Sequence, residues 1–262
     1  MKVPIYQLDA FAERQFAGNP AAVCLLDDWL DDAVMQSIAI ENNLSETAFV
    51  IAEGDHYHIR WFTPAYEVDL CGHATLAAAA VVSRYVDSSC DKVRFKSRSG
   101  PLSVGVKGEE LTLDFPASRP QVIEMPGALR EGLRVEPESV WRGIYYMAVY
   151  PAQQDVAAIQ PDFGKLATLE SDGIIVTAPG DEVDFVSRFF APRAGIPEDP
   201  VTGSAYCVLT PYWSERLGKS RLNALQISPR GGVLYCEDHG DRVLIAGKVA
   251  DYLKGEIEIP DR

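Results

Sequence analysis

The second half of this 262-residue chain repeats the first half in weak outline. The run Arg60-Trp61-Phe62-Thr63-Pro64 returns as Arg188-Phe189-Phe190-Ala191-Pro192, an offset of 128 residues, and Gly72-His73-Ala74 returns as Gly203-Ser204-Ala205, an offset of 131. Further matches at an offset of 132 join Arg98, Gly100, Leu102 and Gly108 to Arg230, Gly232, Leu234 and Gly240. Because the matches keep one order and a nearly constant spacing, the sequence predicts two similar lobes. In a two-lobed enzyme, the cleft between equivalent edges is the default ligand site.

Each half combines short strand patterns with one strongly apolar helical run. These runs cover residues 74–85 and 203–217, and helices that are apolar on all sides are normally buried. We therefore predict an α+β fold of two pseudo-symmetric lobes, each a sheet curled around a central helix. Residues 116–140, rich in Pro, Gly, Glu and Arg, are interpreted as the connection. The predicted lobes are residues 1–118 and 119–262.

The composition excludes several classes of protein. With 47% apolar and 24% charged residues, the chain has the composition of a soluble globular protein. A net charge of −14 argues against nucleic-acid binding, which needs clustered Lys and Arg. No apolar run approaches the roughly 18 to 20 residues of a membrane span. Five cysteines without a Cys-x-x-Cys pair do not form a disulfide framework, and we expect a reduced, cytoplasmic protein.

Both predicted central helices begin with glycine and a small or polar residue, Gly72-His73 and Gly203-Ser204. The free N–H groups and the positive dipole at a helix N-terminus bind carboxylates or phosphates, and glycine lets a ligand approach the backbone. Each pair taken alone is more simply explained as an ordinary turn into a helix. Their occurrence at equivalent places in both halves favours a ligand site.

Two acidic residues lie close to these helices or to apolar strands. Glu46 begins the apolar run Thr47–Ile51, so it is either a solvated strand end or a carboxylate held against apolar surface. Apolar surroundings raise the pKa of a carboxyl group towards the range useful for proton transfer. Asp199 lies between two prolines before Gly203, where an acid can simply stabilise the helix dipole. His73 at a helix start is most often a structural hydrogen-bonding residue.

Five ordered motifs carry a family resemblance over nearly the whole chain. They are Asp9-Ala10-Phe11 with Gly18-Asn19-Pro20-Ala21-Ala22-Val23, Ser45-Glu46-Thr47-Ala48-Phe49, Arg60-Trp61-Phe62-Thr63-Pro64, Cys71-Gly72-His73-Ala74-Thr75, and Glu198-Asp199-Pro200-Val201-Thr202-Gly203-Ser204-Ala205. In these motifs the chain resembles the phenazine-biosynthesis PhzF-like isomerase family, within the diaminopimelate epimerase-like fold, whose curled sheets are mostly antiparallel.

The resemblance implies a cofactor-independent isomerase that moves a proton within a small unsaturated or cyclic carboxylic acid. It assigns the role of general acid/base to Glu46. The residues that it assigns to substrate binding are Ser45, Gly72, His73, Asp199, Gly203 and Ser204. It further implies no metal, a small-molecule carboxylic acid as the substrate, and a homodimer. The characterised reaction of the family is the isomerisation of a dihydro-hydroxyanthranilate.

Cys71 departs from the phenazine enzymes, which have a small residue there. Cys71-Gly72-His73 is closer to the motifs of proline racemase and diaminopimelate epimerase, which use one thiol from each lobe. The matching stretch of the second half, residues 199–203, has no cysteine, so we expect Cys71 to be a packed residue. The alternatives are an amino-acid racemase or epimerase of the same fold, and a non-catalytic protein that binds a metabolite or another protein.

Overall fold

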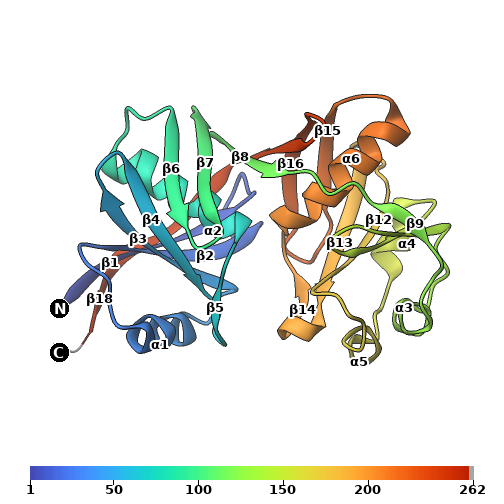
Figure 1. Ribbon diagram of the computed structural model, residues 1–262, viewed down its shortest axis with the longest axis horizontal. Coiled ribbons are helices and arrows are strands. Elements are labelled where there is room, and N and C mark those ends of the chain that lie inside the picture. Colours follow the sequence, from blue (N-terminus) through green and yellow to red (C-terminus); the bar gives the residue numbers. More distant parts are fainter. Residues whose placement is uncertain (260–262) are drawn as a thin grey trace. The chain divides into compact units, whose positions relative to one another are not determined.

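The computed structural model describes residues 1–259 and divides into two compact units of α+β structure (Figure 1). Unit 1 comprises Met1–Asp114 together with the C-terminal stretch that begins at Ala246, and unit 2 comprises Phe115–Ile245. The predicted fold class is confirmed, because each unit is a sheet that holds one long buried helix.

In unit 1, eight strands pair in the order β18-β1-β2-β3-β4-β6-β7-β8. Only the β2–β3 and β4–β6 pairs are parallel, and the short strand β5 pairs with β4. The strands are β1 (Lys2–Ala10), β2 (Asn19–Leu26), β3 (Glu46–Glu53), β4 (His56–Phe62), β5 (Glu67–Val68), β6 (Lys92–Ser97), β7 (Gly100–Lys107), β8 (Glu110–Pro116) and β18 (Val249–Glu258).

The sheet of unit 1 curls around helix α2 (Gly72–Val81), which contacts β1, β2, β3, β7 and β18. Every residue of α2 except Gly72 is buried, as expected for a helix of alanine, leucine and valine. The chain continues from it as a single π-helical turn, Val82–Val86. Helix α1 (Asp32–Asn42) packs on β3 and β4 through Met35, Ile38 and Ala39. Residues 27–31 form the loop before it.

In unit 2, seven strands pair in the order β9-β10-β11-β12-β13-β15-β16. The β11–β12 and β13–β15 pairs are parallel, and the short strand β14 pairs with β13. The strands are β9 (Gln121–Ile123), β10 (Ser139–Arg142), β11 (Tyr146–Val149), β12 (Ile174–Pro179), β13 (Phe185–Ala191), β14 (Ile196–Asp199), β15 (Arg221–Gln226), β16 (Gly232–Asp238) and β17 (Arg242–Gly247).

Helix α6 (Tyr206–Leu217) is the buried helix of unit 2 and packs on β15 and β16. The other helices are α3 (Gly127–Leu133), α4 (Gln153–Ala158) and α5 (Phe163–Leu166), with 3-10 turns at Pro192–Ala194 and Gly203–Ala205. Helix α4 contacts β12 and β13, and α3, α4 and α5 contribute to an apolar core that includes Leu133, Val156 and Phe190. Residues 116–140 are therefore more than the predicted connection, since β9, α3 and the start of β10 lie within them.

The predicted repeat appears as one pairing pattern in both units. From β18 to β7 and from β9 to β16, successive pairs are antiparallel, antiparallel, parallel, antiparallel, parallel and antiparallel. The repeat extends to side chains: Arg60 Nε lies 2.7 Å from Glu67 Oε1, and Arg188 Nε lies 2.7 Å from Glu198 Oε1. Each pair joins the same two strands of its unit, β4 with β5 and β13 with β14.

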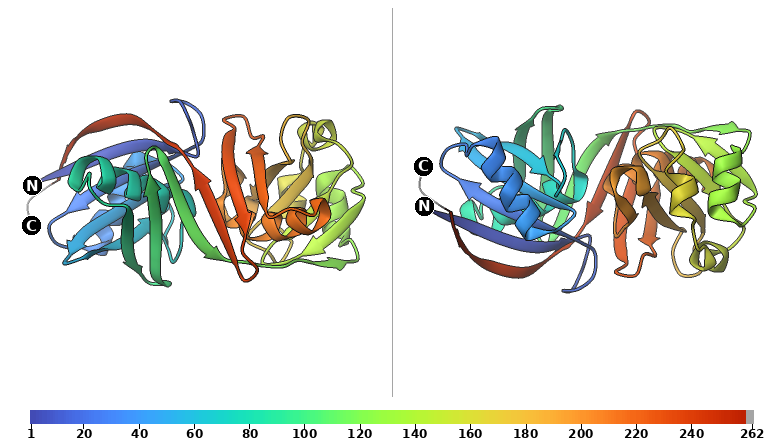
Figure 2. Two further views of the ribbon diagram at one scale, coloured as in Figure 1. Left: turned by 90° about the horizontal axis from the view of Figure 1, so that it is seen from above. Right: turned by 90° about the horizontal axis from the view of Figure 1, so that it is seen from below.

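The bounds of the two units differ from those of the predicted lobes, 1–118 and 119–262, because the C-terminal strand belongs to unit 1. Strand β18 pairs with β1 at nine positions, from Lys2 opposite Glu258 to Ala10 opposite Val249, and so belongs to unit 1. Figures 1 and 2 show β18 (red) beside β1 (blue). Hydrogen bonds across a sheet, and not proximity along the chain, place the last strand in the first unit. Among the described residues, no helix has the length and apolar character needed to span a membrane.

Candidate active site

Glu46 is the first residue of β3, where it pairs with Ala21 of the parallel neighbour β2. The next four residues of the strand are buried, whereas the Glu46 side chain keeps 13% of its surface exposed. The Asn42 amide at the end of α1 donates to Thr47 Oγ1 at 3.0 Å and so fixes the start of the strand. Of the two alternatives from the sequence, a solvated strand end does not fit, because the carboxylate is largely buried and faces the His73 imidazole.

His73 faces Glu46 from the first turn of α2. Its Nε2 lies 3.1 Å from Glu46 Oε2, and its side chain is 6% exposed. No side chain caps the N-terminus of α2, so the backbone N–H groups at Gly72 and His73 are placed where an anion could bind. The predicted residues Ser45, Glu46, Gly72 and His73 therefore lie together at one end of the central helix of unit 1.

Asn19 holds the other side of the imidazole ring. Its Nδ2 lies 3.2 Å from His73 Nδ1, and the asparagine is fully buried at the start of β2. The amide can serve both charge states of the ring, since its NH2 group donates to a neutral imidazole and its oxygen accepts from an imidazolium. Gly18 sets the position of Asn19: its φ is +63°, and a Cβ there would lie 2.2 Å from the carbonyl oxygen of Ala10.

The charges of this cluster are coupled. Burial by itself lowers the pKa of His73, but the neighbouring Cys71 and the facing Glu46 carboxylate outweigh it and hold the pKa well above its usual value. Burial, together with the nearby Glu46 carboxylate, raises the pKa of the Cys71 thiol. A thiol with a raised pKa is protonated near neutral pH, so we attribute the raised pKa of His73 to Glu46 in particular.

Cys71 directly precedes α2 and is buried, with its Sγ 3.6 Å from His73 Nδ1. A buried, protonated thiol is a poor nucleophile and a poor base. The offset of 131 that relates Gly72 to Gly203 places Thr202 at the position of Cys71 in unit 2. Cys207 of unit 2 lies inside α6, where burial raises its pKa to about 12.

In unit 2, Asp199 ends β14 and is buried. Its carboxylate accepts a short hydrogen bond from Thr202 Oγ1. Gln226 at the end of β15 locks the same loop, since its Oε1 accepts from the Thr202 N–H at 2.9 Å and its Nε2 donates to the Asp199 carbonyl at 2.8 Å. This network fixes the direction in which the loop enters the following helix.

Gly203 opens a 3-10 turn, Gly203–Ala205, and the α-helix itself begins at Tyr206. The helical segment therefore begins at Gly203 as predicted, but its first three residues form a 3-10 turn and not an α-helix. Ser204 is half-buried, and its Oγ lies 2.9 Å from the hydroxyl of Tyr145. The predicted residues Asp199, Gly203 and Ser204 thus gather at one loop of unit 2.

Sequence reasoning did not assign roles to Asn19, Tyr145 and Gln226. Asn19 lies within the quoted Gly18-Asn19-Pro20 motif, so a buried polar residue beside an obligatory glycine was an available signal. No comparable signal marks Tyr145 or Gln226, because their partners Ser204 and Thr202 are 59 and 24 residues away.

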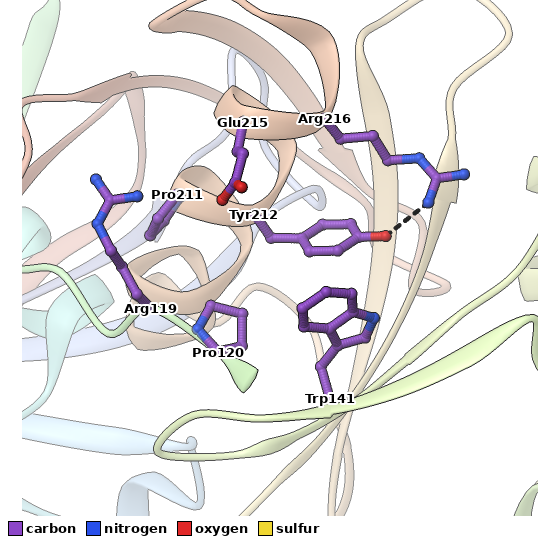
Figure 3. Close-up of a pocket in the computed structure, with 7 residues that line it drawn as sticks. All are labelled: Arg119, Pro120, Trp141, Pro211, Tyr212, Glu215 and Arg216. Carbon is purple, nitrogen blue, oxygen red and sulfur yellow. Dashed lines mark hydrogen bonds between the residues drawn. The ribbon is translucent and has the colours of Figure 1, made fainter. Parts of the chain in front are cut away.

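A separate cavity of about 240 Å³ lies in unit 2 (Figure 3). Aromatic and proline side chains form its walls, and the Arg216 guanidinium donates to the Tyr212 hydroxyl at 2.8 Å. The lining residues are Arg119, Pro120, Trp141, Pro211, Tyr212, Glu215 and Arg216. None of the predicted site residues lines this cavity, so the catalytic assignment does not depend on it.

The fold is that of the diaminopimelate epimerase-like class, and comparison with solved structures agrees. A hydroxyproline epimerase from Agrobacterium vitis, 9% identical, superposes with a TM-score of 0.63 over 99% of this chain and 93% of its own. A PhzF-family phenazine biosynthesis protein from Enterococcus faecalis, 49% identical, superposes with a TM-score of 0.96 over 99% of this chain and 100% of its own.

The chain belongs to the phenazine biosynthesis-like family, PhzC-PhzF, whose sequence profile matches residues 8–130 and 142–255. An uncharacterized isomerase of Pseudomonas aeruginosa is 50% identical over 99% of this chain and 100% of its own length. A human phenazine biosynthesis-like domain-containing protein is 38% identical over 98% of this chain and 99% of its own. The family predicted from the five motifs is confirmed.

Proposed function

We propose that this protein is a cofactor-independent isomerase that moves a proton within a small unsaturated or cyclic carboxylic acid, with Glu46 as the general acid and base. The observation that carries the proposal is the Glu46 carboxylate, held at the start of a buried strand and 3.1 Å from the His73 imidazole. Membership of the PhzC-PhzF family, and the isomerase names of its relatives, support the same class of reaction.

In this mechanism, Glu46 removes a proton from one carbon of the substrate and returns it to another carbon of the same conjugated system. The raised pKa of His73 keeps an imidazolium opposite the carboxylate, and the 3.1 Å contact between them orients the carboxylate oxygen of Glu46. Asn19 holds the ring in place from its other nitrogen. The buried residues that follow Glu46 in β3 limit the access of water, so the proton is retained between removal and return.

Substrate binding is assigned to two sets of residues. In unit 1, the Ser45 hydroxyl and the N–H groups of Gly72 and His73 are suited to a carboxylate, because the uncapped end of α2 carries a partial positive charge. In unit 2, Asp199, Gly203 and Ser204 are proposed to bind substrate, which is the role that the family resemblance assigns to them. We further propose a homodimer, which light scattering coupled to size-exclusion chromatography would test.

The two-thiol racemase is the less favoured alternative. Such an enzyme needs a second thiol at the position that Thr202 occupies, and the Thr202 hydroxyl is already bound to Asp199. Cys71 is a buried thiol with a raised pKa, which makes it a poor base. Treatment with iodoacetamide separates the alternatives. A racemase would lose its activity in step with alkylation. The proposed isomerase, in contrast, would remain as active throughout the treatment as its Cys71→Ser variant.

Incorporation of solvent deuterium into a dihydro-hydroxyanthranilate, followed by NMR, tests the proposal. Glu46→Gln keeps the shape of the side chain but cannot accept the proton, so exchange should fall by about 10² to 10⁴, the usual contribution of general acid–base catalysis. Glu53→Gln is the matched control, since Glu53 lies at the exposed end of the same strand. Exchange that persists undiminished in Glu46→Gln would remove the assignment.

A further inference from the structure

Three metal-ligating groups of unit 1 meet in one buried cluster. A carboxylate oxygen of Glu46, the thiol of Cys71 and a ring nitrogen of His73 all lie within 4.8 Å of one another. Cys71 and His73 are buried, and they flank Gly72 at the start of α2, whereas Glu46 comes from the neighbouring strand β3. Two rigid elements thus bring together three different kinds of donor atom.

Two atoms of this cluster lack a hydrogen-bonding partner. Glu46 Oε2 and His73 Nε2 are buried and face each other as an ion pair at 3.1 Å, but neither atom has a hydrogen bond of regular geometry to any described residue. Buried polar atoms in proteins are nearly always hydrogen-bonded or bound to an ion. A carboxylate oxygen and a ring nitrogen that face each other in this way are suited to holding a cation between them.

We propose that Glu46, Cys71 and His73 bind one Zn²⁺ ion per chain, as an inhibitor and not as a cofactor. Carboxylate, thiolate and imidazole are the usual protein ligands of Zn²⁺, at about 2.0 to 2.3 Å. A tetrahedral ion with these bond lengths places its ligand atoms about 3.5 Å apart. The widest separation in the cluster, within 4.8 Å, therefore has to shorten by about 1.3 Å at most, while the 3.1 Å contact between Glu46 and His73 opens slightly. Three protein ligands leave the fourth position for water or for a carboxylate of a bound acid.

The charges in the cluster balance when zinc binds. The ion displaces the Cys71 proton and one ring proton of the His73 imidazolium, and both protons pass to the buffer. A carboxylate, a thiolate and a neutral imidazole then carry two negative charges, which Zn²⁺ neutralises in the buried site. Mg²⁺ and Ca²⁺ prefer an all-oxygen ligand set and should not compete. Because the ion occupies Glu46, it should stop proton transfer, and this last consequence rests on the proposed function.

The experiment measures metal binding without turnover. Titration of the purified, metal-free protein with ZnCl₂ in a calorimeter should give one site per chain, with a binding enthalpy that depends on the buffer because protons are released. Titration with CoCl₂ should give the near-ultraviolet absorption of a thiolate–cobalt bond. Cys71→Ser should abolish that band and raise Kd for Zn²⁺ at least tenfold. Glu46→Gln should also raise Kd at least tenfold, which provides a second test with Cys71 intact.

The controls address other metal sites on the chain. Cys90 is the least buried of the five cysteines, and His56 lies within 3.3 Å of Glu53 and 3.2 Å of Asp55 on the surface. Cys90→Ser and His56→Gln should bind Zn²⁺ and Co²⁺ as the wild type does. The proposal is overturned if no stoichiometric binding is seen, if Cys71→Ser binds normally, or if His56→Gln removes the site. Zinc binding by a protein that exchanges no deuterium would instead remove the proposed function and leave the metal site in place.

Discussion

Arg188 should be one of the most sensitive positions for the stability of unit 2. Its guanidinium donates to Glu198 at 2.7 and 2.9 Å, and to the backbone carbonyls of Val156 and Ile159 at 3.1 and 2.8 Å. It also lies over the Phe190 ring, 5.0 Å from the centroid. Arg188 therefore joins β13 to β14 and to the end of α4. We consider the substitution Arg188→Met, which keeps most of the apolar stem and removes all four hydrogen bonds.

The expected loss follows from the groups that Arg188→Met leaves behind. The Glu198 side chain is only 16% exposed, and breaking a buried ion pair by removing one partner costs about 3 to 5 kcal/mol. Partial access of water to Glu198 favours the lower end, about 3 to 4 kcal/mol. For a chain of this size, each kcal/mol lowers Tm by about 2 to 4 °C, so Tm should fall by roughly 6 to 16 °C. Replacing Glu198 with Gln in the same chain removes the uncompensated charge and should recover part of the loss.

The assay is urea unfolding followed by tryptophan fluorescence and circular dichroism, for the single and double variants. Lys165→Met is the matched control, because the Lys165–Glu131 pair, at 2.7 Å, joins two side chains that are more than half exposed. Its unfolding midpoint should equal that of the wild type, since exposed ion pairs contribute little. The reasoning is refuted if Arg188→Met unfolds at the same midpoint as Lys165→Met. An equal loss in the double variant would show that the buried Glu198 charge is not the cause.

Three further outcomes are expected. Cys71→Ser should keep most of the deuterium-exchange activity, and a loss of 10³-fold or more would restore the thiol mechanism. Gly18→Ala should destabilise the protein by about 2 to 4 kcal/mol in thermal unfolding and lower exchange activity, because the new Cβ lies 2.2 Å from the Ala10 carbonyl at a φ of +63°; wild-type behaviour would contradict the strain argument. Hydrogen bonds from Arg60 lower the pKa of Glu67, so this pair contributes stability that is present above the unfolded value of about 4.3 and is lost as pH falls through the lower folded value. Urea unfolding of the wild type should therefore weaken more steeply than that of Glu67→Gln below about pH 4.3, and parallel pH curves would argue against the linkage.

Local pattern and internal repetition made much of this protein predictable. The apolar alternation of short strands and the strongly apolar runs that contain most of α2 and α6 follow from burial, which acts within each element. The sequence match between the segments that contain Arg60 and Arg188 predicted two similar lobes, and both units show the same order of parallel and antiparallel strand pairs. The local pattern left Glu46 as either a solvated strand end or a buried carboxylate, and its proposed role as general acid and base came from the family resemblance.

Only the tertiary structure decided which distant residues meet. The C-terminal strand belongs to unit 1 because its backbone hydrogen bonds are satisfied by β1, more than 230 residues earlier, and no local pattern encodes that choice. The contact of Asn19 with His73 depends on how β2 is placed beside α2. The hydrogen bond from Gln226 to the Asp199 carbonyl depends on where β15 ends. Side-chain periodicity fixes which face of an element is buried, whereas the partner of each buried polar group is fixed only when the sheet closes around its helix.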